Sequence, residues 1–182
     1  MSTLMVRNVS GVPTVANFAN MDGTPIVVDS ATGNAYTLVS GVVTLIGSQQ
    51  GTWTPVLTFG TPGDLAVVYS TQEGIYSRAG NAFFVDAGII TSTFTHTTAS
   101  GACRITGLPF TSAATGQFRL ALTWGGITKA GYTDIVGLVN SGNAFVQFQA
   151  FGSGVAPSAV TAADMPTGGS VVLQFSGLYL PA

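Results

Sequence analysis

The side chains that could carry out acid–base or metal chemistry are few in this chain and lie far apart. His96 is the only histidine and Cys103 the only cysteine, so one chain cannot assemble a site from several such ligands. The acidic residues are separated by seven or more positions, so no two neighbours form the paired carboxylates that glycoside hydrolysis requires. The sequence therefore predicts no catalytic residues, no metal and no cofactor, although acids distant in sequence can converge in a fold.

Three of the ionisable residues have ordinary structural interpretations. His96 lies among threonines at the end of an apolar stretch, so we expect a surface or hydrogen-bonded histidine. Cys103 lies among apolar residues and is expected to be a small buried side chain. Asp86 falls within a long apolar stretch, where an outward-facing position or an ion pair with Arg78 would accommodate its charge.

The low content of charged residues is the most informative property of the composition. They make up 7% of the chain, whereas ordinary soluble domains carry about 25%. The mean hydropathy is +0.47, and a surface so poor in charge is weakly protected against association. We infer that copies of the chain or a larger assembly cover much of it. The scattered basic residues predict no nucleic-acid binding, and the interrupted apolar stretches and missing secretory signal predict no membrane insertion.

The first fifty residues are predicted to differ from the rest. Abundant glycine, proline and β-branched residues favour strands and turns. Three short strands are expected, at Thr24–Asp29, Ala35–Val39 and Val42–Ile46. Residues 1–21 should be irregular and residues 47–51 should form a linker. Because three short strands are marginally stable alone, residues 1–48 are predicted to be an attachment segment that docks on a partner.

Residues 51–182 show turn signals every eight to twelve residues, a spacing typical of sandwiches and barrels. The strands expected there are Trp53–Phe59, Leu65–Tyr69, Glu73–Arg78, Ala82–Thr95, Cys103–Gly107, Gln117–Thr123, Ile127–Lys129, Asp134–Val139, Ala144–Phe151 and Val171–Leu180. Helix is limited to a turn or two, the nearest candidates being Val15–Met21 and Ala162–Met165. We therefore predict an all-β fold, an antiparallel jelly-roll-like β-sandwich with a small N-terminal β attachment segment.

Most of the aromatic side chains are expected in the core of this sandwich. Several lie near turns, where an exposed ring could contact a neighbouring subunit, another partner or a glycan. The candidates for such contacts are Trp53, Tyr69, Tyr76, Trp124 and Tyr132.

Three segments of the chain carry a family resemblance. Gly51–Gly60 reads GTWTPVLTFG, Tyr69–Asn81 reads YSTQEGIYSRAGN and Ser100–Phe110 reads SGACRITGLPF, while Phe175–Tyr179 closes with FSGLY. Together they resemble a module that recurs in virion proteins of tailed bacteriophages. The resemblance implies a trimeric β-sandwich knob on the virion, found in capsid decoration proteins and at the tips of tail or head fibres.

Two hypotheses for function follow from the resemblance. The first is a homotrimeric capsid decoration (cement) protein, in which residues 1–48 hold the major capsid protein or another virion protein. It is favoured because the N-terminal part has no fibrous repeat or coiled coil. The alternative is the receptor-binding tip of a tail or head fibre that attaches to host surface glycan. Both place the chain on the virion, assembled in the host cytoplasm. A glycan-cleaving enzyme is a third hypothesis.

Overall fold

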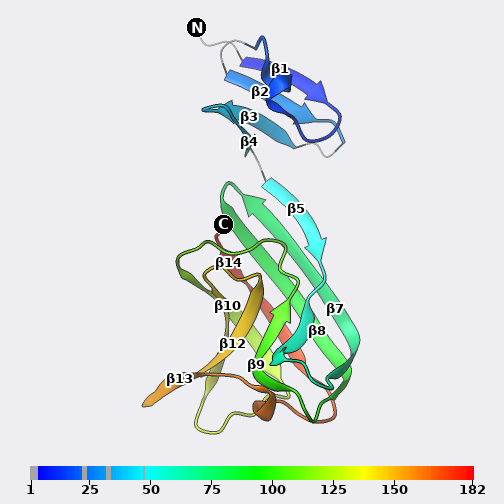
Figure 1. The fold of residues 1–182 in the computed structure, drawn as a ribbon, viewed down its shortest axis with the longest axis vertical. Helices are drawn as coiled ribbons and strands as arrows, with labels where there is room; N and C mark the ends of the chain where they lie inside the picture. Colours follow the sequence, from blue (N-terminus) through cyan, green and yellow to red (C-terminus); the bar gives the residue numbers. More distant parts are fainter. Residues whose placement is uncertain (1–3, 22–23, 32–33, 47) are drawn as a thin grey trace. The chain divides into compact units, whose positions relative to one another are not determined.

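The computed structural model describes residues 4–21, 24–31, 34–46 and 48–182. The chain forms two compact units, Met1–Gln49 with Arg78–Gly80, and Gln50–Ser77 with Asn81–Ala182. Figure 1 labels most of the strands of both units, numbered in chain order. Each unit has a hydrophobic core of its own. Within the described residues, no helix has the length and apolar character needed to cross a bilayer.

The first unit is a small four-stranded sheet. Its strands, in spatial order, are β1 (Leu4–Val9), β2 (Thr24–Asp29), β3 (Ala35–Val39) and β4 (Val42–Ile46). Phe18, Val27 and Tyr36 form its buried core, and a short 3-10 helix (Val15–Phe18) contributes Phe18. The three strands predicted in this region are confirmed. The prediction of an irregular stretch over residues 1–21 was wrong for β1, which pairs in parallel with β2.

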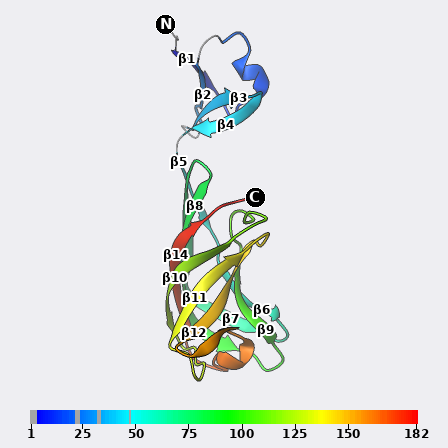
Figure 2. The same cartoon turned by 90° about the vertical axis from the view of Figure 1, so that its left-hand side faces the viewer.

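The second sheet contains ten strands. They are β5 (Ser48–Trp53), β6 (Val56–Thr61), β7 (Ala66–Ala79), β8 (Ala82–Thr95), β9 (Ser100–Thr106), β10 (Gln117–Gly125), β11 (Asp134–Asn140), β12 (Phe145–Gly152), β13 (Val155–Ala159) and β14 (Val172–Tyr179). Their spatial order is β5-β7-β8-β14-β10-β11-β12-β9-β6, with β13 beside β12. Figure 2 shows β14, β10, β11 and β12 side by side.

Strand β10 makes the sheet curl, because its two ends pair with different neighbours. Gln117–Leu120 pair with β11, whereas Ala121–Gly125 pair with β14. We call β7, β8, β14 and the second part of β10 the β14 half, and the first part of β10 with β11, β12, β9 and β6 the β12 half. The inner faces of the halves meet, since the rings of Phe148 and Phe175 lie 6.4 Å apart and those of Phe59 and Phe94 lie 6.0 Å apart. The predicted all-β, antiparallel fold is confirmed.

Several element boundaries differ from those predicted. The predicted strand Trp53–Phe59 is interrupted before β6, where Pro55 has no N–H to donate to a ladder. The two predicted strands Leu65–Tyr69 and Glu73–Arg78 join into the single strand β7. The predicted strand Ile127–Lys129 is loop. Local sequence patterns place these boundaries poorly, because tertiary pairing decides where a strand continues.

Two segments predicted as connections are partly structured. The predicted linker 47–51 is wrong for residues 48–51, which begin β5, while residue 47 lies outside the described residues. A Cβ atom at Gly51 would lie 2.6 Å from the Tyr76 ring, so this glycine allows β5 to approach that ring closely. The loop predicted over residues 152–166 contains β13 and a 3-10 helix (Ala162–Asp164), the latter where a helical turn was expected.

Candidate interaction surfaces

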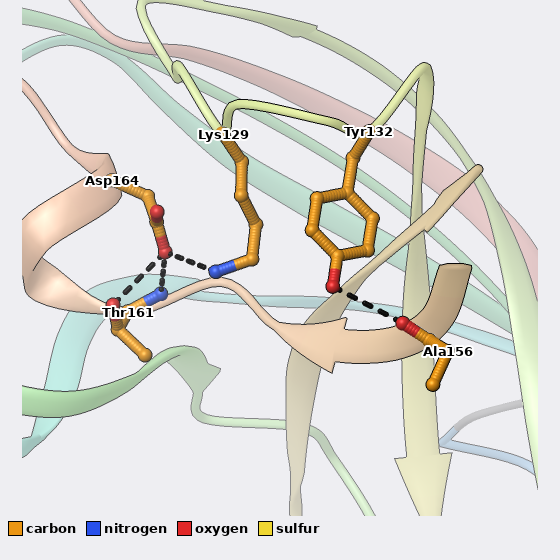
Figure 3. Close-up of polar contacts among 5 residues, drawn as sticks. All are labelled: Lys129, Tyr132, Ala156, Thr161 and Asp164. Atoms are coloured by element: carbon orange, nitrogen blue, oxygen red, sulfur yellow. Dashed lines mark hydrogen bonds and ion pairs between the residues drawn. The ribbon is translucent and has the colours of Figure 1, made fainter. Parts of the chain in front are cut away.

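Trp124 and Tyr132 are brought together by the loop that joins β10 to β11. Both line a pocket of about 190 Å³, together with Lys129 and Asp134. Trp124 is 37% exposed at the end of β10. The Tyr132 hydroxyl donates a hydrogen bond to the carbonyl oxygen of Ala156 at 3.1 Å (Figure 3). The pocket therefore combines an accessible aromatic ring with an anchored tyrosine and two charged groups.

An ion pair fixes the loop that carries this pocket. The Lys129 ammonium lies 2.8 Å from the Asp164 carboxylate, which also accepts hydrogen bonds from the backbone N–H and hydroxyl of Thr161 (Figure 3). Partial burial alone would raise the pKa of Asp164, but the hydrogen bonds from Lys129 and Thr161 outweigh it and lower that pKa. The charged form of Asp164 thus ties the β10–β11 loop to the segment after β13.

The other three candidate aromatics are largely covered within the chain itself. Trp53 is 8% exposed, and its indole N–H donates to the carbonyl oxygen of Ile75 at 3.3 Å. Tyr69 is half-buried, its hydroxyl oxygen accepts the backbone N–H of Leu57 at 3.0 Å, and burial raises its pKa. Tyr76 is likewise half-buried against the core. Of the five rings predicted to contact partners, Trp124 is thus the most accessible one in the single chain, and the predicted contacts stay predictions.

His96 is not the surface or hydrogen-bonded residue that the sequence suggested. Its side chain is 6% exposed and lies 5.2 Å from the Phe59 ring and 5.4 Å from the Phe94 ring. Its Nε2 atom finds no hydrogen-bond partner among the residues that the structure describes. His96, one residue after the end of β8, thus lies against the apolar core, which its threonine neighbours in sequence did not reveal. Cys103, by contrast, is buried as predicted.

The outer face of the β14 half carries an acidic groove. Glu73 on β7 and Asp86 on β8 line a groove of about 380 Å³, whose walls include the small residues Gly88, Ala121 and Ser176. Asp86 is exposed, which confirms the outward-facing position that was one of the two alternatives expected for it. Two carboxylates that are thirteen positions apart in the sequence thus lie in one groove of the fold.

Exposed apolar side chains lie beside this groove on the same face. Phe84 and Leu178 are cross-strand partners and are 45% and 49% exposed, and Ile75 is 57% exposed. Asp86 is the cross-strand partner of Ser176 in the same pair of strands. The outer face of the β14 half thus combines two carboxylates with a patch of large apolar side chains.

The outer face of the β12 half carries two arginines that rest on aromatic rings. The Arg104 guanidinium carbon lies 4.6 Å from the centroid of the Phe145 ring, and that of Arg119 lies 5.4 Å from the centroid of Phe151. Gln147 is the direct cross-strand partner of Arg104. The Nε atom of Arg104 is buried without a hydrogen-bond partner among the described residues. Sequence reasoning missed this surface because strand register, and not sequence spacing, places each arginine over its ring.

No protein-family model matches the chain, and no curated protein matches it. Among the described residues, no three histidine, cysteine or acidic side chains gather into a group that could hold a metal ion. A solved structure, that of the Dettilon tailspike protein (gp208), is similar to 72% of this chain with a TM-score of 0.53 and 17% sequence identity. The matched region is 24% of the tailspike, so this chain spans about a quarter of that protein. The likeness is one of fold.

Proposed function

We propose that this chain is a structural protein of a tailed-bacteriophage particle that takes part in attachment to the host cell. The observation that carries the proposal is the fold likeness to a phage tailspike protein over 72% of the chain. The motifs that resemble a phage virion module lie in and beside strands β5 to β9 and β14. The low content of charged side chains supports a part that works inside an assembly.

In this proposal the two compact units have different functions. Residues 1–48 hold another virion protein, and residues 51–182 form a β knob exposed on the particle. The knob is a homotrimer on the particle, so several weak contacts act together through their high effective concentration. Attachment that is weak for one copy thereby becomes durable for the assembly.

The pocket of Trp124 and Tyr132 is the proposed contact for a host surface glycan. An accessible indole offers a flat apolar surface, and the nearby Lys129 and Asp134 offer polar groups that can orient a bound hydroxyl compound. The Tyr132 hydrogen bond and the Lys129–Asp164 ion pair hold the pocket in shape before binding.

Capsid decoration is the second candidate function. The first unit has a core of its own, formed by Phe18, Val27 and Tyr36, and a separate small unit suits anchoring to a shell. In this version the chain is a cement protein that ties neighbouring capsid proteins together and raises the temperature at which the shell breaks.

Gold-labelled antibodies against the purified chain distinguish these proposals. Labelling of the tail of the phage that encodes the chain is expected for host attachment. Labelling spread over the capsid would overturn host attachment in favour of decoration, and unlabelled particles would overturn both.

Binding of the purified chain to host cells tests the glycan contact. Trp124→Ala should weaken binding at least tenfold, whereas Val68→Ala, which also shortens an exposed side chain, should leave it unchanged. Equal binding by both variants would contradict the assignment of this pocket.

A further inference from the structure

Some charged side chains of the second unit have an ion-pair or hydrogen-bond partner among the described residues, and others do not. Lys129 and Asp164 form an ion pair between their side chains. Asp64 and Asp134 accept backbone N–H groups. Four charged side chains remain that form neither an ion pair nor a hydrogen bond with any described residue: Glu73, Asp86, Arg104 and Arg119. Glu73, Asp86 and Arg119 are exposed, so their charges are available to groups of another molecule.

These four charges are separated by sign. Both carboxylates lie on the outer face of the β14 half, and both arginines lie on the outer face of the β12 half. The inner faces of the two halves pack against each other through Phe148 and Phe175. The two outer faces therefore point away from each other, and the opposite charges cannot pair within one chain.

We propose that the acidic outer face of one copy binds the arginine-bearing outer face of the next copy. The proposal rests on the self-association included in the proposed function and names the surfaces that make it. The contact is heterologous, because two different faces meet, so copies form a closed ring when the rotation between them closes and an open filament when it does not. Each copy then uses both faces, which explains why both signs of charge are kept.

The acidic groove suits an incoming guanidinium group. Gly88, Ala121 and Ser176 keep the groove open between the strands, at about 380 Å³. A Cβ atom at Gly88 would lie 3.4 Å from the Glu73 carboxylate oxygen, so a larger side chain there would fill the space beside that carboxylate. Carboxylates bind the planar guanidinium group with two parallel hydrogen bonds when both are accessible.

The arginine face is arranged in advance for such a contact. Stacking on Phe145 and Phe151 restricts the two guanidinium groups, so less side-chain freedom is lost on binding. The apolar patch of Phe84, Leu178 and Ile75 lies beside the carboxylates and would exclude water from the charge pairs. Apolar contact and charge complementarity therefore act on the same two faces.

Charge reversal in the full chain tests the proposal by sedimentation velocity. The wild-type protein should sediment as a multiple of 18.5 kDa. Asp86→Arg offsets the charge of Glu73 and places a cation opposite the arginines, and Arg119→Glu offsets the charge of Arg104 and places an anion opposite the carboxylates. Each variant should therefore raise the dissociation constant at least tenfold. A 1:1 mixture of the two variants should form mixed pairs, because the charge introduced at position 86 of one variant meets the opposite charge introduced at position 119 of the other. A three-membered ring of the two variants would keep one contact between like variants, so pairs are the expected product. Ser153→Glu, in the exposed β12–β13 turn, is the control for added charge and should behave as wild type.

A variant that leaves every charge in place separates groove shape from net charge. Gly88→Val should weaken association at least tenfold by filling the groove, and circular dichroism of each variant monitors folding. Wild-type association of both reversal variants, or a mixture that stays dissociated although both variants are folded, would overturn the proposal. Labelling of phage particles is a separate readout, so failure of this interface and failure of the proposed function can be told apart.

Discussion

Replacing Phe175 by alanine tests whether ring packing between the inner faces holds the curled sheet together. Phe175 is 3% exposed, and its ring lies 6.2 Å from Trp53 and 6.4 Å from Phe148. Truncating a buried phenylalanine costs about 3–5 kcal/mol through lost burial and the cavity left behind. Each lost ring pair accounts for about 0.5–1.5 kcal/mol beyond its buried area. Since domains are stable by about 5–15 kcal/mol, we expect Phe175→Ala to remove at least about 3 kcal/mol of the free energy of unfolding.

Phe84 provides a matched control on the neighbouring strand. It is 45% exposed on the outer face, so Phe84→Ala should change the free energy of unfolding by no more than about 0.5 kcal/mol. Urea unfolding followed by tryptophan fluorescence measures both variants, in the Arg119→Glu background so that association of copies does not contribute. A loss below about 1.5 kcal/mol for Phe175→Ala, or equal losses for both variants, would show that ring packing between the inner faces does not hold the sheet together.

Three further predictions concern single residues. Hydrogen bonds from Thr97 and Thr98 lower the pKa of Asp64 below its ordinary 3.8. Hydrogen exchange of the Thr97 amide should therefore be slow above pH 3.8 and become fast as the pH falls further, because protonation of Asp64 weakens the hydrogen bond. Asp64→Asn should abolish this pH dependence. Burial raises the pKa of the Cys103 thiol well above its usual range, so a thiol reagent at pH 8 should label it only in denaturant. Gly107→Ala, at φ +92° and against a backbone carbonyl, should cost more stability in urea unfolding than Gly142→Ala, at φ +71° in open space, which should cost about 1–2 kcal/mol; equal costs would contradict this.

Strands with strong local signals could be predicted from the sequence. Ala82–Thr95 was found with its bounds, because it is a long stretch rich in apolar and β-branched residues and Gly80 and Asn81 mark the preceding turn. Strand β1 was missed, because its parallel partner is a separate segment of chain and local residues do not reveal that pairing. The corner in β10 was missed for the same reason, since only the three-dimensional register shows that its two ends pair with different strands.

Some of the candidate surfaces could be predicted from the sequence. Trp124 and Tyr132 were named because they lie near turns, and the β10–β11 loop places them in one pocket. The groove of Glu73 and Asp86 could not be predicted, because carboxylates thirteen positions apart meet only through the pairing of β7 with β8. His96 was misjudged, because the hydroxyl-bearing residues beside it in sequence do not surround it in space, where two aromatic rings do.

We expect copies of this chain to cover surfaces that a solitary chain of such low charge would leave exposed. Sedimentation equilibrium of the wild-type full chain over a hundredfold range of concentration tests it most directly. We expect an assembly whose mass is a multiple of 18.5 kDa and which dissociates only on dilution. A stable species of 18.5 kDa at every concentration would contradict the claim.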